Sequence, residues 1–305
     1  MNPVNTKPYK LPADATWFIT GCSSGIGRET AKLVASNPTQ RLVATARNIS
    51  SLSYLPNDNP NILKLTLDVA SPTSVSSAFK EAAAYFGSDF HIDVLVNNAG
   101  YSLSGDTEGV TEEEMHDVIE TDFFGLVRVT INALKVMRQG KDHRGGLIFN
   151  ISSVAGVCAF PGHSFYHAGK FAVEGWSESV ARELHPDWNI NLCIVEPGAV
   201  KTNFETSSKK HIKPHEAYTA EDMPARKLEA MVKKGLAAGV GVEPIEVAKV
   251  LVLVANRNQK VPLHLPLTST AVNLIKVKLK GRLEELESVQ ELSAIDLGQP
   301  QFKLD

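Results

Sequence analysis

The sequence predicts an α/β fold in which a doubly wound parallel sheet carries helices on both of its faces. Short, nearly continuously apolar segments alternate with segments of helical periodicity along most of the 305 residues. Strands that helices cover on both faces have this uniformly apolar character. The alternation favours parallel strands joined by right-handed crossovers. The length is compatible with a single domain, because doubly wound sheets of this size often form one unit.

Six segments have the strand pattern, and capping residues mark two of the helices between them. The expected strands are 15–20, 41–46, 62–69, 93–99, 146–152 and 190–197. Ser71 and Pro72 are typical of an N-cap followed by the first residue of a helix, which we expect to continue to Phe86. Thr111 and Glu114 form a capping-box pattern ahead of a long helix that reaches about Met137.

Two regions depart from this alternation. Residues 199–241 are polar and then helical, with no strand of their own, and such an insertion predicts a lid over a ligand site. Residues 279–292 carry leucine or valine every three or four positions among charges, which predicts an amphipathic helix packed on the body or on a partner subunit. We therefore expect an N-terminal arm at 1–13, a main domain at 14–270 and a helical extension at 271–305.

Composition excludes several classes of protein. The net charge of −3 argues against a nucleic-acid groove and a basic membrane-binding face. The three separated cysteines, Cys22, Cys158 and Cys193, indicate buried free thiols in a reducing compartment, with a reactive Cys22 as the alternative. The first twenty residues lack a secretory pattern, and the apolar run 250–255 is too short to span a membrane. We expect a cytoplasmic protein.

A glycine-rich turn at 20–27 lies directly between the first strand and a helix. Gly21, Gly25 and Gly27 permit a tight turn, close approach of a pyrophosphate and close helix packing. The amides at the N-terminus of the following helix offer hydrogen bonds to that anion. The spacing G-x-x-x-G-x-G differs from the G-x-G-x-x-G of most dinucleotide folds, but its position predicts a nicotinamide dinucleotide site.

The end of the second strand predicts which dinucleotide binds. A carboxylate there would bind the ribose 2′-hydroxyl, but residues 44–48 contain no acid and offer Arg47. A guanidinium suits a 2′-phosphate, so we expect NADP(H) rather than NAD(H); a solvated arginine is the alternative. Asp68 is placed to accept a hydrogen bond from the adenine amino group or to cap the following helix.

Tyr166 and Lys170 are four residues apart and would lie on one face of a helix. A free tyrosine titrates near ~10, and lowering its pKa to ~7 requires roughly 4 kcal/mol, which a neighbouring cation can partly supply. The pair therefore suggests a general acid and base, although tyrosine and lysine at this spacing are common on helices.

Five motifs in order, TGCSSGIG (20–27), NNAG (97–100), NISS (150–153), Tyr166 with Lys170, and EPG (196–198) with Thr202, resemble the short-chain dehydrogenase/reductase family. The similarity covers about 14–270 and is greatest to the branch of 17β-hydroxysteroid and retinol dehydrogenases and microbial ketoreductases. It implies a single Rossmann-type domain with seven strands in the order 3-2-1-4-5-6-7.

The resemblance also implies roles. Ser153, rather than Ser152, would polarise the substrate oxygen, Tyr166 would transfer the proton, and Lys170 would bind the nicotinamide ribose and lower the pKa of tyrosine. One acid and one hydrogen-bond donor must converge on a carbonyl that accepts a hydride. The expected cofactor contacts are Gly21, Ser23, Ser24, Gly25, Ile26, Gly27, Arg47, Asp68, Val69, Asn97, Ala99, Gly100, Tyr166, Lys170, Pro197, Gly198, Val200 and Thr202.

One position departs from the family pattern. Asp122 stands where the family has an asparagine that holds a water in a proton relay to the lysine. An aspartate can still accept a hydrogen bond from that water, but its charge would offset the effect of Lys170 on Tyr166. We expect Asp122 to take part in a variant relay in which the pKa of Tyr166 is raised.

The resemblance thus implies an NADP(H)-dependent oxidoreductase that interconverts a carbonyl and a secondary alcohol. Alternatives are an NAD-dependent alcohol dehydrogenase, a cofactor-binding protein without turnover, and an epimerase or dehydratase. Histidines and carboxylates show no metal-ligand pattern, and the family mostly forms dimers through the helix before the fifth strand and the helix of Tyr166. Residues near the site in sequence suggest a hydrophobic substrate: Tyr101, Leu103, Val154, Phe160, Phe165 and Phe204.

Overall fold

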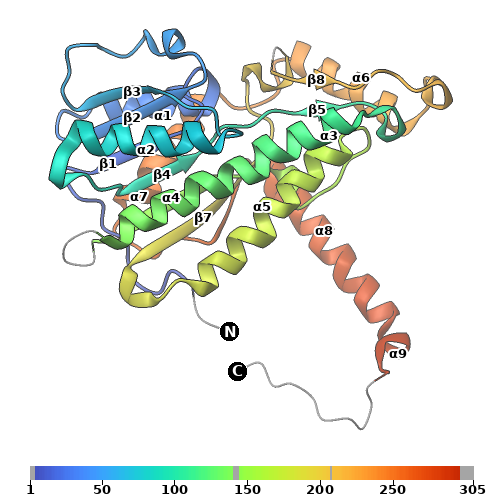
Figure 1. Cartoon of the computed structure of the whole chain (residues 1–305). Helices are drawn as coiled ribbons and strands as arrows, with labels where there is room; N and C mark the ends of the chain where they lie inside the picture. Colours follow the sequence, from blue (N-terminus) through green and yellow to red (C-terminus); the bar gives the residue numbers. More distant parts are fainter. Residues whose placement is uncertain (1–3, 140–143, 207, 296–305) are drawn as a thin grey trace.

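The computed structural model describes residues 4–139, 144–206 and 208–295, and its centre is a seven-stranded parallel sheet (Figure 1). Its strands lie in the order β3-β2-β1-β4-β6-β7-β9, which is the order that the resemblance implies. Six strands match the sequence prediction, whereas β9 was not located by it. The strands are β1 Thr16–Ile19, β2 Arg41–Ala46, β3 Ile62–Thr66, β4 Val94–Asn97, β6 Gly146–Ile151, β7 Ile190–Pro197 and β9 His264–Leu267.

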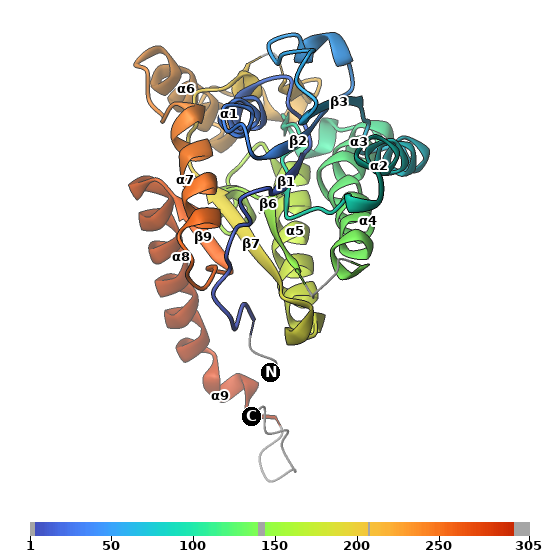
Figure 2. The same cartoon turned by 90° about the vertical axis from the view of Figure 1, so that its left-hand side faces the viewer.

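Helices cover both faces of the sheet (Figure 2). On one face lie α1 (Gly25–Ala35) and α7 (Pro244–Asn256), and on the other lie α2 (Pro72–Phe86), α4 (Leu126–Gln139) and α5 (Ser164–Glu183). In β1, Trp17 and Ile19 belong to the first core and Phe18 to the second, because successive strand residues point to opposite faces. Burial on both faces explains the uniformly apolar strands.

The capping predictions are confirmed, but the long helix after Thr111 is interrupted. Ser71 caps α2, and Thr111 forms a capping box with Glu114 at the start of α3 (Glu112–Ile119). A π-helical turn, Glu120–Gly125, then leads into α4. Gly125 lies against Val69, where an added Cβ would come 2.7 Å from Cγ2, so the chain passes closely beneath the end of β3.

The region 199–241 does contain a strand, which corrects the sequence expectation. β8 (Lys210–His211) pairs in parallel with β5 (Leu103–Ser104), and α6 (Pro224–Ala237) follows it. The pairing escapes a pattern search because it involves two residues per strand, and both residues of β8 are exposed. Short 3₁₀ turns lie at Ile49–Leu52, Gly87–Asp89, Thr107–Gly109, Val154–Gly156, Pro186–Trp188, Asn203–Glu205 and Glu216–Tyr218.

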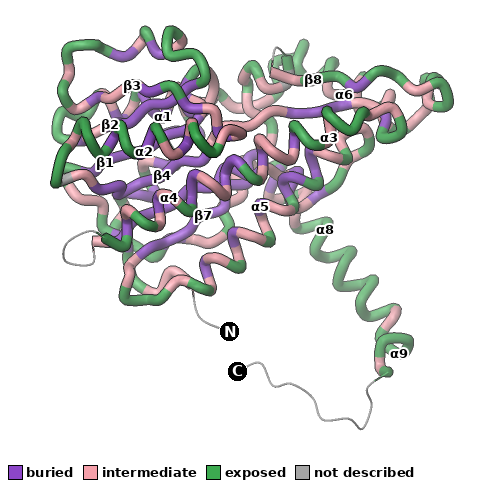
Figure 3. Tube along the Cα trace, in the orientation of Figure 1, coloured by how far each residue is buried: buried purple, intermediate pink, exposed green. Residues whose placement is uncertain are grey.

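The described parts of the two terminal segments differ in how they contact the body. In the N-terminal arm, Tyr9 is buried and its hydroxyl donates to the Asp93 carbonyl at 2.8 Å. At the other end, α8 (Ser269–Ser288) and α9 (Gln290–Ser293) extend beyond the sheet (Figures 1 and 3). The leucines of α8 that we expect to pack on the body or on a partner subunit, Leu279, Leu283 and Leu286, are exposed in this single chain. Within the described residues, no helix is both long and apolar enough to cross a bilayer.

Candidate active site

The glycine-rich turn between β1 and α1 is held closely against the loop that follows β4. A Cβ on Gly21 (φ +71°) would come 2.9 Å from the Ala99 Cα, and one on Gly27 would come 2.5 Å from the Gly21 oxygen. The Asn98 side chain donates to the carbonyls of Thr20 and Gly21 at 3.0 and 3.1 Å. Sequence reasoning missed Asn98, although it is the second asparagine of NNAG.

The N-terminus of α1 leaves amide groups available to an anion. Its N-cap, Ser24, has an extended backbone and makes no side-chain capping bond. Across from it, Thr202 lies so near that a Cβ on Gly25 would be 3.1 Å from its methyl group. A narrow cradle with free helix N–H groups suits the pyrophosphate of a dinucleotide. Ser23 is exposed at the mouth of this turn, whereas Ile26 is buried beneath it.

Cys22 lies in the same turn but is not a reactive thiol. It is completely buried, and burial raises its pKa to about 12. At neutral pH it is therefore protonated, and thiols react as thiolates. Cys158 and Cys193 are also free and buried, as expected.

At the adenosine end of the cradle, Arg47 and Asp68 follow β2 and β3. Arg47 is exposed and makes no ion pair with another described residue. The Asp68 carboxylate accepts a hydrogen bond from the Ala70 amide at 3.0 Å. Ser71 caps the following helix, so the alternative role of Asp68 as its N-cap is wrong. Val69 is buried beside it.

At the end of β4, Asn97 and Ala99 make different hydrogen bonds. The Asn97 side chain is 3% exposed and donates to Thr130 and Asn150, each at 2.8 Å, so it joins β4 to β6 inside the body. Any contact of Asn97 with a cofactor must therefore come from its backbone. The Ala99 amide donates to the Thr20 hydroxyl at 3.1 Å, and the adjacent Gly100 lies against the Asp122 carboxylate.

Tyr166 and Lys170 lie together on one face of α5, and both are buried. The Lys170 ammonium donates to the Ile151 carbonyl at 3.1 Å and lies 5.8 Å from the centre of the Tyr166 ring. Phe204, from the segment that follows β7, contacts the same ring at 5.6 Å between centroids. Helical spacing thus places the phenol and the cation side by side, as the sequence predicts.

The π-helical turn directs Asp122 to this pair. Its Oδ1 accepts the Tyr101 amide at 2.9 Å, and its Oδ2 lies 3.8 Å from the Lys170 nitrogen. Oδ2 is buried and accepts no hydrogen bond from any described residue. Burial raises the pKa of Asp122 to about 6, against the opposing effects of Lys170 and the Tyr101 amide. Above that pH, the site holds a carboxylate with an unfilled acceptor.

Ser153 and Ser152 have different surroundings. Ser152 is buried and its hydroxyl donates to Glu174, on the helix of Tyr166. Ser153 begins the turn Val154–Gly156, where its oxygen accepts the Ala155 amide at 3.1 Å. That bond leaves the Ser153 hydroxyl proton available to another acceptor.

His167 connects the turn that follows Ser153 to α5. Its Nε2 accepts the Phe160 amide at 2.9 Å, which requires Nδ1 to carry the proton that it shares with the Ala155 carbonyl at 2.7 Å. Burial lowers its pKa, so the neutral form is favoured. Sequence analysis assigned His167 no role, because its partners are backbone groups in an irregular loop.

A second polar cluster, Glu174, Glu196 and His264, lies behind Ser152. His264 Nδ1 is 2.9 Å from Glu196 and 3.6 Å from Glu174, and these two acids raise its pKa to about 10. Their ligand atoms lie within 4.8 Å of one another, an arrangement of metal-ligand type that the sequence did not reveal. The protonated imidazole already balances part of the carboxylate charge.

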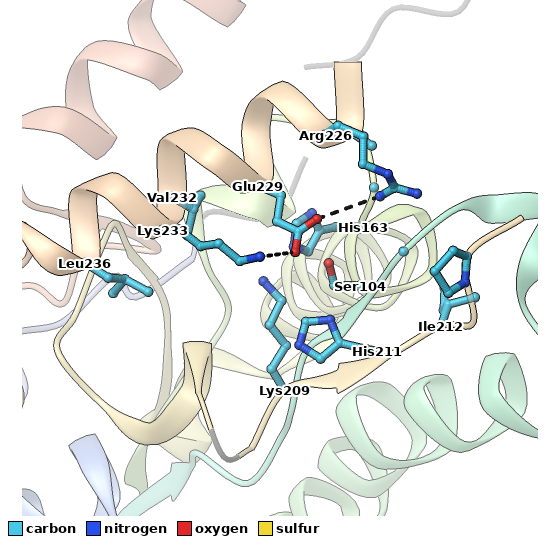
Figure 4. Close-up of a pocket in the computed structure, with 14 residues that line it drawn as sticks. Ser104, His163, Lys209, His211, Ile212, Arg226, Glu229, Val232, Lys233 and Leu236 are labelled. Atoms are coloured by element: carbon cyan, nitrogen blue, oxygen red, sulfur yellow. Dashed lines mark ion pairs between the residues drawn. The ribbon is translucent and has the colours of Figure 1, made fainter. Parts of the chain in front are cut away.

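A hollow of about 250 Å³ lies beneath α6, next to β5, β8 and the start of α5 (Figure 4). It is lined by charged side chains as well as Ile212, Val232 and Leu236, and Tyr166 is not among its lining residues. Arg226 pairs with the buried Asp106, and Lys233 pairs with Glu229. Of the expected apolar contacts, Leu103 instead belongs to a small core with Val118 and Ile212.

Gly198 and Val200 connect the end of β7 to the region 199–241. The Gly198 amide donates to the Leu267 carbonyl at 3.0 Å, and an added Cβ would come 2.5 Å from the Thr268 hydroxyl. Val200 forms a parallel bridge with Val242, just after the end of this region. Pro197 and Thr202 therefore flank a segment that is held at both ends, opposite the glycine turn.

Comparisons with known proteins agree with this geometry. The family model for short chain dehydrogenases matches residues 15–213. The oxidoreductase calM of Penicillium decumbens is 72% identical over 304 residues, 100% of both chains. Retinol dehydrogenase 8 of Bos taurus is 37% identical over 79% of this chain and 78% of its own. A crystal structure of a short-chain dehydrogenase from Streptomyces avermitilis superposes with a TM-score of 0.79 at 32% identity, covering 92% of this chain and 98% of that one.

The chain is thus similar to known oxidoreductases along its whole length. It also has the glycine cradle, the helical face shared by Tyr166 and Lys170, and the sheet order described above. The protein belongs to the short-chain dehydrogenase family of oxidoreductases, whose members use nicotinamide cofactors.

Proposed function

We propose that the protein is an NADP(H)-dependent oxidoreductase that interconverts a ketone and a secondary alcohol on a hydrophobic small molecule. The observation that supports this most directly is the buried Lys170 ammonium beside the Tyr166 ring, on the same helical face and 3.8 Å from Asp122. A buried phenol, a cation and a carboxylate that lie close together form a site that can hold and move a proton.

The cradle fits a dinucleotide, because the glycine turn has no room for side chains and the first amides of α1 are uncapped. Gly21, Ser24 and Ile26 would hold the pyrophosphate, and Thr202 would close over it. Lys170 would hold the nicotinamide ribose, and the cofactor, when bound, supplies or accepts the hydride. Pro197, Gly198 and Val200 would line the nicotinamide.

In reduction, Tyr166 donates its proton to the substrate oxygen while the carbonyl carbon receives a hydride. Ser153 donates a hydrogen bond to the same oxygen, which stabilises the charge that develops there. The proton lost by Tyr166 is replaced from solvent, through a water held by the free oxygen of Asp122 beside Lys170. Oxidation of the alcohol reverses each transfer.

Arg47 supports the choice of NADP(H), because it is exposed at the end of β2 without a carboxylate partner among the described residues. Comparing kcat/KM with NADPH and NADH tests the assignment. A lost charged hydrogen bond is worth about 1.5–3 kcal/mol, so Arg47→Ala should lower kcat/KM for NADPH roughly 10- to 100-fold and leave NADH nearly unchanged. Equal use of both cofactors by both forms would refute it.

The hydrophobic substrate class is supported by Phe204 against the Tyr166 ring and by the similarity to a protein named as a retinol dehydrogenase. Oxidation of NADPH should be measured with a panel of aliphatic, aromatic and polycyclic ketones. We expect turnover with the apolar members and a loss of roughly 10²- to 10⁴-fold in Tyr166→Phe. A folded protein that binds NADPH but turns over no member would instead favour a binding protein.

A further inference from the structure

The exposed part of α8 has an apolar stripe that no other described residue covers. Every residue from 276 to 288 is exposed, as the green helix in Figure 3 shows. Leu279, Leu283 and Leu286 are 60, 57 and 52% exposed and recur at spacings of four and three, on one face of the helix. Most helical stability in proteins comes from packing such a face, so a helix surrounded by water on all sides lacks its main support.

The part of the body that the structure describes does not cover this stripe. Only the first turns of α8 contact it, through the buried Ala271 and the half-buried Val272 and Ile275. From there the helix extends beyond the sheet in both views of the molecule (Figures 1 and 2). The rise of an α-helix makes the exposed stretch 276–288 about 20 Å long. Val272 and Ile275 continue the same stripe, so the seam spans about two heptads.

The charges on this helix are segregated along its length. Four basic residues come first in α8 and three acidic residues follow: Lys276, Lys278, Lys280 and Arg282, then Glu284, Glu285 and Glu287. The order is unfavourable for an isolated helix, because carboxylates near its C-terminus face the negative end of the macrodipole. Its internal pairs, Lys280 with Glu284 and Arg282 with Glu285, also have the weaker orientation.

We propose that α8 is a self-association helix that pairs antiparallel with α8 of a second copy of this chain. Antiparallel pairing places the basic half of each helix against the acidic half of the other, whereas parallel pairing would oppose like charges. A two-fold axis between residues 282 and 283 brings Leu279 level with Leu286 of the second copy. It also brings Lys278 and Lys280 level with Glu287 and Glu285 of that copy.

An anionic membrane fits this helix less well. Amphipathic helices that lie on membranes carry lysine and arginine along the polar face. Here the acidic half would be repelled by the same lipids that attract the basic half.

The mass of the purified full chain, measured by sedimentation at micromolar concentration, tests the proposal. Leu279→Glu/Leu283→Glu should halve the number of chains in the particle. The matched control Val277→Glu lies on the opposite side of the same helix, is already 71% exposed, and should leave the mass unchanged. All three side chains are exposed, so thermal unfolding should confirm that the variants fold.

Charge exchange and cross-linking test the orientation. Lys278→Glu/Lys280→Glu and Glu285→Lys/Glu287→Lys should each weaken self-association, and mixing the two should restore a mixed particle. Leu283→Cys, near the axis, should form a disulfide-linked dimer, and Leu279→Cys should not.

A monomeric wild type would overturn the proposal. So would an unchanged mass in Leu279→Glu/Leu283→Glu, which would assign association to another surface, such as the exposed Ile131 on α4 and Phe171 on α5. Flotation of a monomer with phosphatidylserine vesicles, lost in the same variant, would replace the second copy by a membrane.

Discussion

Replacing Asp122 with asparagine should make the protein more stable at neutral pH, although it removes half of a buried ion pair. The carboxylate has no exposed side-chain surface, and its pKa rises from 3.8 to about 6 in the folded protein. This shift of roughly 2 units corresponds to about 3 kcal/mol of differential stability between the two protonation states. The pKa of about 6 already includes the attraction of Lys170, so burial affects this pKa more strongly than Lys170 does.

The sign of the pH dependence follows from the direction of the shift. Because the folded pKa lies above the unfolded one, the protonated carboxyl favours folding. This contribution is fully present below about pH 4, falls as the pH rises, and is lost above about 6. An asparagine is neutral at every pH and can still accept a hydrogen bond from the Tyr101 amide. The variant therefore does not lose this stability as the pH rises. Its amide nitrogen near Lys170 reduces the gain, and we expect Asp122→Asn to be about 1–3 kcal/mol more stable at pH 7.5.

Urea unfolding of the apo protein, followed by tryptophan fluorescence between pH 4.5 and 7.5, measures this difference. The advantage of Asp122→Asn over the wild type should grow by up to about 2 kcal/mol across this range. Asp117→Asn is a matched control, because its half-exposed carboxylate pairs with Lys210 at the surface and should contribute less than about 1 kcal/mol. An advantage that does not change with pH would refute the argument that burial dominates at Asp122.

Three further predictions concern the chemistry. In Asp122→Asn the alkaline limb of the pH–rate profile should move to lower pH, because the carboxylate no longer offsets the effect of Lys170 on Tyr166; an unchanged profile would contradict the variant relay. Asn98→Ala should weaken NADPH binding, measured by fluorescence titration, about 10-fold, since two hydrogen bonds that hold the glycine turn are lost. His167→Phe should lower kcat more than it raises the KM for the ketone, because the turn bearing Ser153 loses its connection to α5 while the cofactor cradle is untouched. An equal fall with His163→Phe, whose ring is less buried at the start of α5, would argue against a specific role.

Much of the fold and site was readable from local patterns. Apolar runs located six strands, capping residues located the start of α2 and α3, and four-residue spacing placed Tyr166 beside Lys170. These inferences succeed because strand burial, helix capping and helical periodicity are properties of neighbouring residues. The glycine turn belongs with them, since its position between a strand and a helix is itself a local pattern.

Other features depend on residues that are far apart in the chain and meet only when it folds. Asn98 reaches the glycine turn, His167 bonds backbone groups of an irregular loop, and His264 at the start of β9 meets Glu174 on α5. The pairing of β5 with β8 and the π-helical turn that contains Asp122 have no sequence period of their own. Thus the sequence alone determined which residues can carry the chemistry. The tertiary structure decided which of them are buried together, because burial and long-range contacts set their charge state.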